Sequence, residues 1–307
     1  MEDFHKDIVA CYLYIITKHG YPPRAEKSIG HLHELKELGF RSIELEGIRE
    51  EHLEGIHSMR HQIRAEADKL GLNIPIFCVV LPGLSSADEK ERERNLQLFN
   101  MGCETAEALG SEAVLDNAPL PPWKFPEGIP VTRHYDEKIL SAATLPAELD
   151  WKKYHDGLVD TFRMACDIAS NRNLNYHLHP CYGAFVNSTD AFLLFSEAVK
   201  RDNLRFNLDT ANQYYMKDNI FLSLIRLQDH IDYIHLSDCS GAQLEHMAPG
   251  DGQIEWDQFF EILDRIHYRG MMGIDVGGAE TGVTDLDLAY RSSAEWLMEK
   301  WYRHLSD

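Results

Sequence analysis

Basic residues are scarce in this sequence. Its 307 residues include 30 Lys and Arg against 50 Asp and Glu, which gives a formal net charge of −20 at pH 7. Proteins that bind nucleic acid, or an anionic membrane surface, use a basic face to neutralise phosphate groups. The charge balance therefore predicts no nucleic-acid partner and no membrane partner.

Long apolar runs and closely paired cysteines are missing as well. The longest apolar run, residues 8–16, is too short to span a bilayer, and the opening MEDFHKD is too acidic and polar for a signal peptide. The six cysteines are scattered and form no C-x-x-C pair, a pattern typical of reduced thiols. We therefore expect a cytoplasmic protein without a disulfide framework.

Short β-branched or aromatic runs alternate with long amphipathic segments along the chain. Three of the amphipathic segments end at Gly39, Gly71 and Gly110, and glycine is common just after the last turn of a helix. The predicted strands are residues 7–15, 41–47, 73–80, 112–117, 173–180, 204–210, 231–238 and 271–277. This order predicts repeated βα units with short connections.

Eight such units in a chain of 307 residues predict an α/β protein with a single (β/α)8 TIM-barrel domain over residues 1–307. A doubly wound open sheet is the alternative, but no Gly-rich phosphate-binding turn follows the first predicted strand. The barrel fold directs attention to the carboxyl ends of the strands, where the active sites of such barrels lie.

One long insertion, residues 118–150, follows the fourth predicted strand. It contains the segment PLPPWKFPEGIP, which is rich in proline and aromatic residues. We interpret the insertion as a lid over the mouth of the barrel. An oligomer contact and simple surface decoration are the alternatives.

Polar side chains stand near the ends of the last four predicted strands, which are otherwise largely apolar. His177 and His179 share one face of the fifth strand, and Asp209, His235 and Asp275 come near the ends of the sixth, seventh and eighth. A single histidine at such a position is usually a hydrogen-bonded core residue. Polar groups at that depth are unfavourable unless they are paired, so four strands with the same feature indicate one shared site. Imidazole and carboxylate ligands suit manganese, iron, cobalt or zinc.

Five segments carry a resemblance that covers nearly the whole chain: YHLHP, LDTAN, YIHLSD, PGDGQIEWDQFFEIL and GIDVGG. In these the sequence resembles the xylose-isomerase-like TIM barrels, also called the sugar phosphate isomerase/epimerase superfamily. In the keto-sugar epimerases of this family, one divalent metal ion is held by Glu, Asp, His and Glu at the ends of strands five to eight.

The resemblance implies a metal site made of His177, Asp209, His235 and Asp275. His177 and Asp275 stand where the family has glutamates, and Asn212 replaces a histidine that follows the aspartate ligand. One divalent ion is expected, with manganese favoured and zinc, cobalt, iron or magnesium as alternatives. Whether His177 or His179 is the ligand from strand five stays open at this point.

Both epimerase glutamates act as bases on opposite sides of the sugar, so their replacement changes the expected proton chemistry. A histidine bound to a metal cannot also accept a proton, and we therefore predict that His179 is a general acid/base. Asp275 is predicted to be a ligand that acts as its counterpart. The alternative is that His179 only donates a hydrogen bond to a hydroxyl group.

The substrate is predicted to be an uncharged sugar or a glycoside, because few basic residues follow the predicted strands. Glu46, Trp123 and His246 are the predicted substrate-binding residues. The alternatives are a rim salt bridge for Glu46 and a structural role for Trp123. A homo-oligomer is compatible with the sequence.

Three functions are compatible with these features. The first is a divalent-metal-dependent isomerase or epimerase that acts on a keto sugar or keto-glycoside through a metal-stabilised enediolate. The second is a lyase that eliminates a group β to the ketone of a 3-keto glycoside. The third is a barrel that binds sugar without catalysis. A nuclease is disfavoured by the acidic charge.

Overall fold

The computed structural model describes residues 3–126 and 137–302. Its strands are parallel and lie in the order β6-β5-β4-β3-β2-β1-β9-β8-β7. The strands are β1 (Ile8–Ala10), β2 (Ser42–Ile48), β3 (Asn73–Val80), β4 (Ala113–Asn117), β5 (Asn175–His179), β6 (Leu204–Phe206), β7 (Leu208–Asp209), β8 (Tyr233–Leu236) and β9 (Met271–Ile274).

The two ends of this sheet, β6 and β7, are separated in sequence by Asn207 alone. The Asn207 backbone N–H donates to the Leu178 carbonyl of β5 at 3.0 Å, and its side-chain Nδ2 donates to the Tyr233 carbonyl of β8 at 3.3 Å. One residue therefore bridges both neighbours and nearly closes the sheet into a barrel. The eight-stranded TIM-barrel prediction is confirmed, with the sixth strand divided in two.

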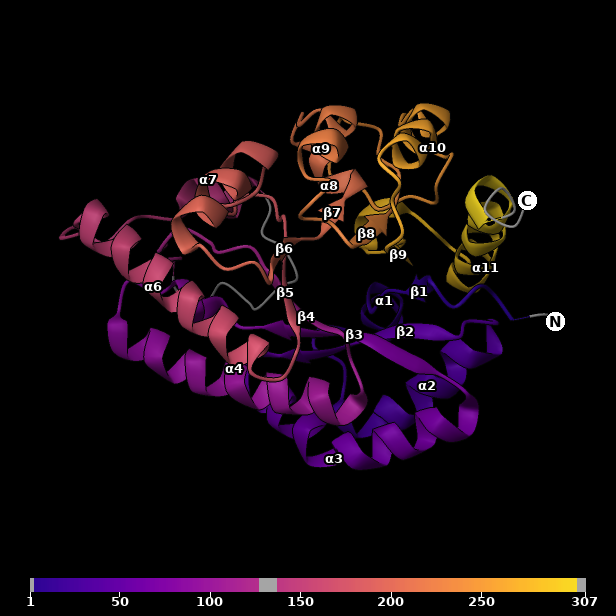
Figure 1. Ribbon diagram of the computed structural model, residues 1–307, viewed down its shortest axis with the longest axis horizontal. Coiled ribbons are helices and arrows are strands. Elements are labelled where there is room, and N and C mark those ends of the chain that lie inside the picture. The colour runs from indigo at the N-terminus through magenta and orange to yellow at the C-terminus, as the bar shows by residue number, and fades with distance from the viewer. Residues whose placement is uncertain (1–2, 127–136, 303–307) are drawn as a thin grey trace.

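Helices surround the barrel and connect its strands (Figure 1). Helices α3, α4 and α6 pack side by side along one flank, and the shorter helices α7 to α10 lie around the later strands. The helices are α1 (Leu13–His19), α2 (Ser28–Glu37), α3 (Arg49–Leu70), α4 (Glu89–Leu109), α5 (Glu137–Ala142), α6 (Trp151–Ser170), α7 (Thr189–Val199), α8 (Thr210–Tyr215), α9 (Ile220–Arg226), α10 (Trp256–Arg265) and α11 (Leu286–Leu297).

The predicted helix ends agree with the structure. Gly71 and Gly110 follow α3 and α4 with φ of 65° and 77°, a left-handed conformation that glycine adopts without strain. The first strand differs from its prediction, because β1 ends at Ala10 and residues 13–19 form α1. The apolar run continues through both elements, and an apolar run alone does not separate a buried strand from a buried helix.

Part of the barrel interior below the mouth is apolar. A separate buried cluster lies there, formed by Val9, Ile76, Cys78, Ala113, Leu115 and Tyr233. The larger core lies between the sheet and the helices and includes Phe99, Phe162 and Tyr176. Polar side chains are concentrated one layer higher, at the carboxyl ends of the strands.

Part of the predicted insertion is described. Lys124 and Thr144 form an isolated antiparallel bridge, and α5 precedes it on the return path. The rest of the insertion, residues 127–136, lies outside the described residues. Among the residues that are described, no helix combines the length and hydropathy needed to cross a membrane.

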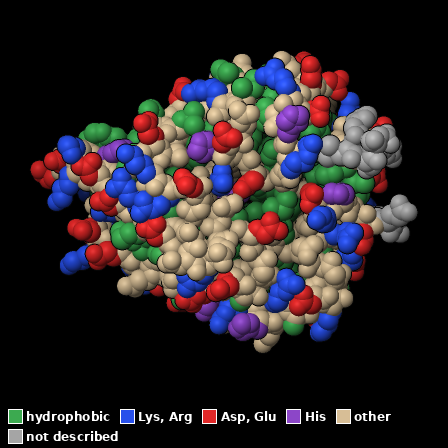
Figure 2. Space-filling view, in the orientation of Figure 1, with side chains coloured by type: hydrophobic (Ala, Val, Ile, Leu, Met, Phe, Trp, Pro, Cys, Tyr) green, Lys and Arg blue, Asp and Glu red, His purple; other side chains and the backbone are tan. Residues whose placement is uncertain are grey.

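Acidic and basic side chains are interspersed on the molecular face shown in Figure 2. Outside the grey residues, this face carries no continuous basic stripe of the kind that phosphate-binding proteins use.

Candidate active site

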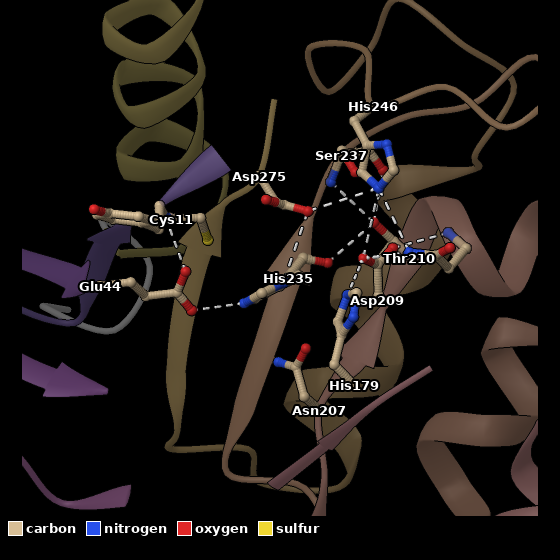
Figure 3. Close-up of polar contacts among 12 residues, drawn as sticks. Cys11, Glu44, His179, Asn207, Asp209, Thr210, His235, Ser237, His246 and Asp275 are labelled. Atoms are coloured by element: carbon tan, nitrogen blue, oxygen red, sulfur yellow. Dashed lines mark hydrogen bonds and ion pairs between the residues drawn. The ribbon is translucent and has the colours of Figure 1, made fainter. Parts of the chain in front are cut away.

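Four ionisable side chains converge at the mouth of the barrel. His179 ends β5, Asp209 ends β7, His235 lies in β8, and Asp275 follows β9. One nitrogen or oxygen atom from each of them lies within 4.8 Å of the corresponding atom of every other. Figure 3 shows these side chains pointing toward one another from neighbouring strands. The parallel sheet produces this convergence because all its strands end at the same rim.

His179 and Asp209 form the closest pair. The His179 Nε2 lies 2.8 Å from the Asp209 Oδ2, and Asp209 is completely buried. Burial disfavours a charged imidazole, but the Cys181 sulfur and the Asp209 carboxylate together raise the pKa of His179 well above its usual value. Burial opposes ionisation of Asp209 too, yet its contact with His179 holds the pKa of Asp209 well below the usual range.

His235 is held from the opposite side of the barrel by Glu44 of β2. The His235 Nε2 lies 2.8 Å from the Glu44 Oε1, and the same oxygen accepts a 2.7 Å hydrogen bond from the Tyr233 hydroxyl. The second Glu44 oxygen accepts from the Tyr12 backbone N–H at 3.0 Å. These bonds direct the His235 Nδ1 toward the cluster, where it is buried and has no hydrogen-bond partner among the described residues. Asp275 Oδ2 lies 3.7 Å from it.

His246 completes the upper edge of the cluster. Its Nε2 lies 3.7 Å from Asp275 Oδ2 and 3.8 Å from Asp209 Oδ2, and the residue is 1% exposed. Asn212 donates from Nδ2 to Asp209 Oδ2 at 2.8 Å and fixes that carboxylate from the far side. His246 was predicted to bind substrate, and the structure places it beside the four clustered side chains.

His177 does not join this cluster. Although it shares a face of β5 with His179, it lies two residues deeper, which is roughly 6–7 Å along a strand. Its Nε2 forms an ion pair of 2.9 Å with Asp232, just before β8. The structure therefore differs from the expectation at strand five: His179, and not His177, lies with Asp209, His235 and Asp275. The placement of His179 also differs from the predicted free general acid/base, because its Nε2 faces Asp209.

A cavity opens above the four clustered side chains; we refer to it as the first cavity. Glu46 lines it, together with both Asn117 at the end of β4 and the buried Glu44. Trp123 is not among its lining residues, and the Trp123 ring instead lies near Gly183. Glu44 and Asn117 were not predicted as site residues. Applying the strand-end reasoning to strands two and four would have found both, since Glu44 shares the inward face with Glu46.

Asp238 organises the turn formed by residues 249–252, Pro-Gly-Asp-Gly, at the rim of the barrel. Its carboxylate accepts hydrogen bonds from the Gly250 backbone N–H at 2.8 Å and from the Trp256 indole at 2.8 Å. A Cβ atom at Gly252 would lie 2.2 Å from Asp238 Oδ1, so a side chain there would displace the carboxylate. Asp238 is thus a structural residue of the rim.

The sequence profile of the family described as "Xylose isomerase-like TIM barrel" matches residues 32–300, which is most of the chain. The chain belongs to this family. Its similarity to individual curated members is partial. An inosose dehydratase of Clostridium beijerinckii is 26% identical over an alignment of 145 residues, and the match covers 42% of this chain and 47% of that enzyme. The chain thus matches about half the length of this relative.

Solved structures of two epimerases share the fold along nearly the whole chain. The 3-keto-D-glucoside 4-epimerase of E. coli is 17% identical, and its superposition has a TM-score of 0.71 and covers 96% of this chain and 100% of that enzyme. The D-psicose 3-epimerase of Clostridium cellulolyticum H10 is 16% identical with a TM-score of 0.73, covering 95% and 98% of the two chains.

The four clustered side chains fit a divalent metal ion. Two imidazoles and two carboxylates form a donor set that suits manganese, iron, cobalt or zinc. The His235 Nδ1 is a buried nitrogen that forms no hydrogen bond within the described part of the chain. A carboxylate holds the other nitrogen of its ring, as is usual for histidines that bind metals.

Proposed function

We propose that this protein is a divalent-metal-dependent sugar isomerase or epimerase that acts on a keto sugar or keto-glycoside. The observation that carries the proposal is the convergence of His179, Asp209, His235 and Asp275 within 4.8 Å at the mouth of a xylose isomerase-like barrel. These four residues are the proposed ligands, and manganese is the favoured ion. The bound ion would supply Lewis-acid stabilisation of negative charge on the substrate's oxygen atoms.

Proton transfer is assigned to Asp275. It would remove the proton from the carbon next to the ketone, so that the electron pair of that C–H bond forms a carbon–carbon double bond and the pi pair of the carbonyl group moves onto its oxygen to give an enediolate. Return of this proton from the Asp275 carboxyl group to the neighbouring carbon would give the isomer. Delivery of a solvent proton to the opposite face of the same carbon would give the epimer. His246 is proposed to orient a substrate hydroxyl, which its distance of 3.7 Å from Asp275 supports. Glu46 is proposed to accept a hydrogen bond from another hydroxyl, which its position in the wall of the first cavity supports.

Elimination is the second candidate reaction. It begins with the same removal of a proton by Asp275. The carbonyl group then re-forms, a double bond forms between the α and β carbons, and the leaving group on the β carbon departs with the electron pair of its bond and takes up the proton held by Asp275. Two observations favour it. The first is that the glutamates which the two-base epimerases carry on strands five and eight are both replaced here. The second is that the curated relative from Clostridium beijerinckii, of which this chain matches about half, is named an inosose dehydratase.

The insertion of residues 118–150 is proposed to cover the mouth of the barrel and to contribute to substrate binding. Phe125 within it lines a cavity that adjoins the candidate site, and Trp123 packs against Phe125 with ring centroids 6.0 Å apart. Replacing Trp123 with Ala should raise KM several-fold while the melting temperature stays nearly unchanged. A large fall in melting temperature at constant KM would assign Trp123 a structural role.

Metal analysis followed by a solvent-exchange assay tests the proposed function. Protein loaded with Mn²⁺ should bind about one ion per chain and should catalyse incorporation of deuterium from D2O next to the ketone of a keto sugar or 3-keto glycoside. Release of a leaving group would assign elimination, and exchange without release would assign isomerisation or epimerisation. Absence of exchange with every metal and every keto sugar in the screen would leave a non-catalytic sugar-binding barrel.

A further inference from the structure

A second cavity of about 230 Å³ adjoins the first cavity. The two cavities share five lining residues, Tyr21, Val80, Asn117, Cys181 and Tyr182. The second cavity extends away from the metal cluster, between the ends of β3 and β4, helix α6 and the beginning of the insertion. A substrate larger than one sugar ring could therefore occupy both cavities at once.

The walls of the second cavity are mainly apolar. Leu81 follows β3, Leu120 and Phe125 belong to the insertion, and Phe162 comes from α6. The lining also includes the polar side chains of Ser85, Asn117 and Tyr182, but apolar surface predominates, and a second sugar would leave some of its hydroxyls without hydrogen bonds. An apolar ring would gain from burial and could contact the two phenylalanine rings.

Arg49 is the cationic residue in the wall of this cavity. Its Nε is buried and has no hydrogen-bond partner among the described residues. Its φ is 58°, a left-handed conformation that is uncommon for residues other than glycine and is often retained at binding sites. A planar guanidinium held in this way is suited to stack on an aromatic ring or to donate to its oxygen substituents.

Asp116, the acidic residue in the same wall, does not oppose an uncharged ring. It is 3% exposed, and its Oδ1 accepts a hydrogen bond from the Leu81 backbone N–H at 3.3 Å. Burial raises the pKa of Asp116 to about 8, so its carboxyl group is mostly protonated at neutral pH. The cavity therefore combines apolar walls, a neutral carboxyl group and one guanidinium.

We propose that the substrate is a glycoside with an aromatic aglycone. The keto sugar ring would lie in the first cavity beside the metal cluster, and the aglycone would fill the second cavity. This inference rests on the proposed function, because the metal cluster identifies where the sugar ring lies. It adds the substrate class, which the cluster alone does not specify.

Calorimetric binding tests this inference without requiring turnover. The Mn²⁺-loaded protein would be titrated with glucose, with cellobiose and with 4-nitrophenyl β-D-glucoside. We expect the aryl glucoside to bind at least about tenfold more tightly than glucose, because the aglycone buries apolar surface in the second cavity. Cellobiose should show no comparable gain.

Two matched variants locate the gain in affinity. Leu120→Trp should fill the second cavity and remove the gain, with little change in the affinity for glucose. Leu145→Trp places the same residue in the same insertion at a position that is 53% exposed and lines neither cavity, so it should retain the gain. Phe125→Ala, which removes one wall, should reduce the gain and serves if Leu120→Trp lowers the melting temperature.

The results separate the two proposals. An aryl glucoside that binds no more tightly than glucose, or not at all, overturns the inference, and so does a gain that Leu120→Trp and Phe125→Ala leave intact. A gain with cellobiose that Leu120→Trp removes would assign the cavity to a second sugar instead. If the aryl gain is present and Leu120→Trp removes it, but no keto sugar exchanges deuterium, the proposed function fails while the aglycone cavity stands.

Discussion

The two halves of the barrel, β1 to β4 with the segments that follow them and β5 to β9 with theirs, differ in the length of several elements and in the chemistry of their side chains. In the first half, β2 and β3 have 7 and 8 residues, and α3 and α4 have 22 and 21. In the second half, β8 and β9 have 4 residues each, and α9 and α10 have 7 and 10. All four clustered side chains, from His179 to Asp275, belong to the second half.

This difference shows how the site divides its tasks. The second half supplies the proposed metal ligands from adjacent strand ends. The first half supplies Glu44, which reaches across the barrel to His235, and most of the apolar walls of the second cavity. Metal binding should therefore depend mainly on the second half, and the orientation of one ligand and the choice of substrate should depend on the first.

The largest expected effect separates the two histidines of β5. Replacing His179 with Gln should weaken Mn²⁺ binding by on the order of 100-fold or more, because it removes a proposed ligand. Replacing His177 with Gln should leave metal affinity within about threefold and lower the free energy of unfolding by roughly 1–3 kcal/mol, because it breaks the contact between the buried imidazole and the partly exposed Asp232 carboxylate. Metal titration and chemical denaturation would measure both. The opposite pattern would restore His177 as the ligand.

Glu44 tests whether the first half influences the metal site. Replacing Glu44 with Gln should weaken metal binding by roughly 10- to 100-fold, because the amide holds the His235 ring less firmly than a carboxylate does. Tyr233→Phe is the matched control, since it removes one hydrogen bond to Glu44 and keeps the carboxylate. We expect its metal affinity to change less than that of Glu44→Gln. Equal effects of the two changes on affinity and melting temperature would indicate a packing role only.

Metal binding should release protons. In the metal-free protein the pKa of His179 is raised well above its usual value and that of His235 is raised as well, despite burial, so these imidazoles hold protons toward neutral pH. A ligand histidine must be neutral, and metal affinity should therefore increase as pH rises through these raised pKa values. Calorimetry at pH 7 in buffers of different ionisation enthalpy should detect about one to two protons released per ion. A pH-independent affinity between pH 6 and 8 would contradict the proposed ligand set.

The smallest effect concerns Asp116 in the first half. Its pKa is raised to about 8 in the folded protein, against roughly 3.9 for an unfolded aspartate, so the folded state loses stability as pH rises between these values. Asp116→Asn carries no charge at any pH. Its free energy of unfolding relative to wild type should increase by about 1–3 kcal/mol from pH 4.5 to pH 6, as measured by urea denaturation. A difference that does not change with pH would contradict a buried neutral carboxyl.

Much of the fold follows from local patterns in the chain. The glycines after the helices and the alternation of apolar runs with amphipathic segments predict eight βα units, and the structure has a strand in each predicted run. Local patterns were insufficient at the first strand, where one apolar run contains both β1 and α1. The division of the sixth strand at Asn207 also depends on hydrogen bonds to two neighbouring strands.

The sequence by itself determined which strand ends carry histidine or aspartate, because side chains alternate along a strand and parallel strands end at one rim. It could not decide between His177 and His179, since both lie on the same face and differ only in depth. In the structure, His177 contacts Asp232 below the mouth of the barrel and therefore does not reach the four clustered side chains. The role of Glu44 and the second cavity likewise depended on tertiary structure, because each requires segments far apart in the chain to meet across the barrel or beside it.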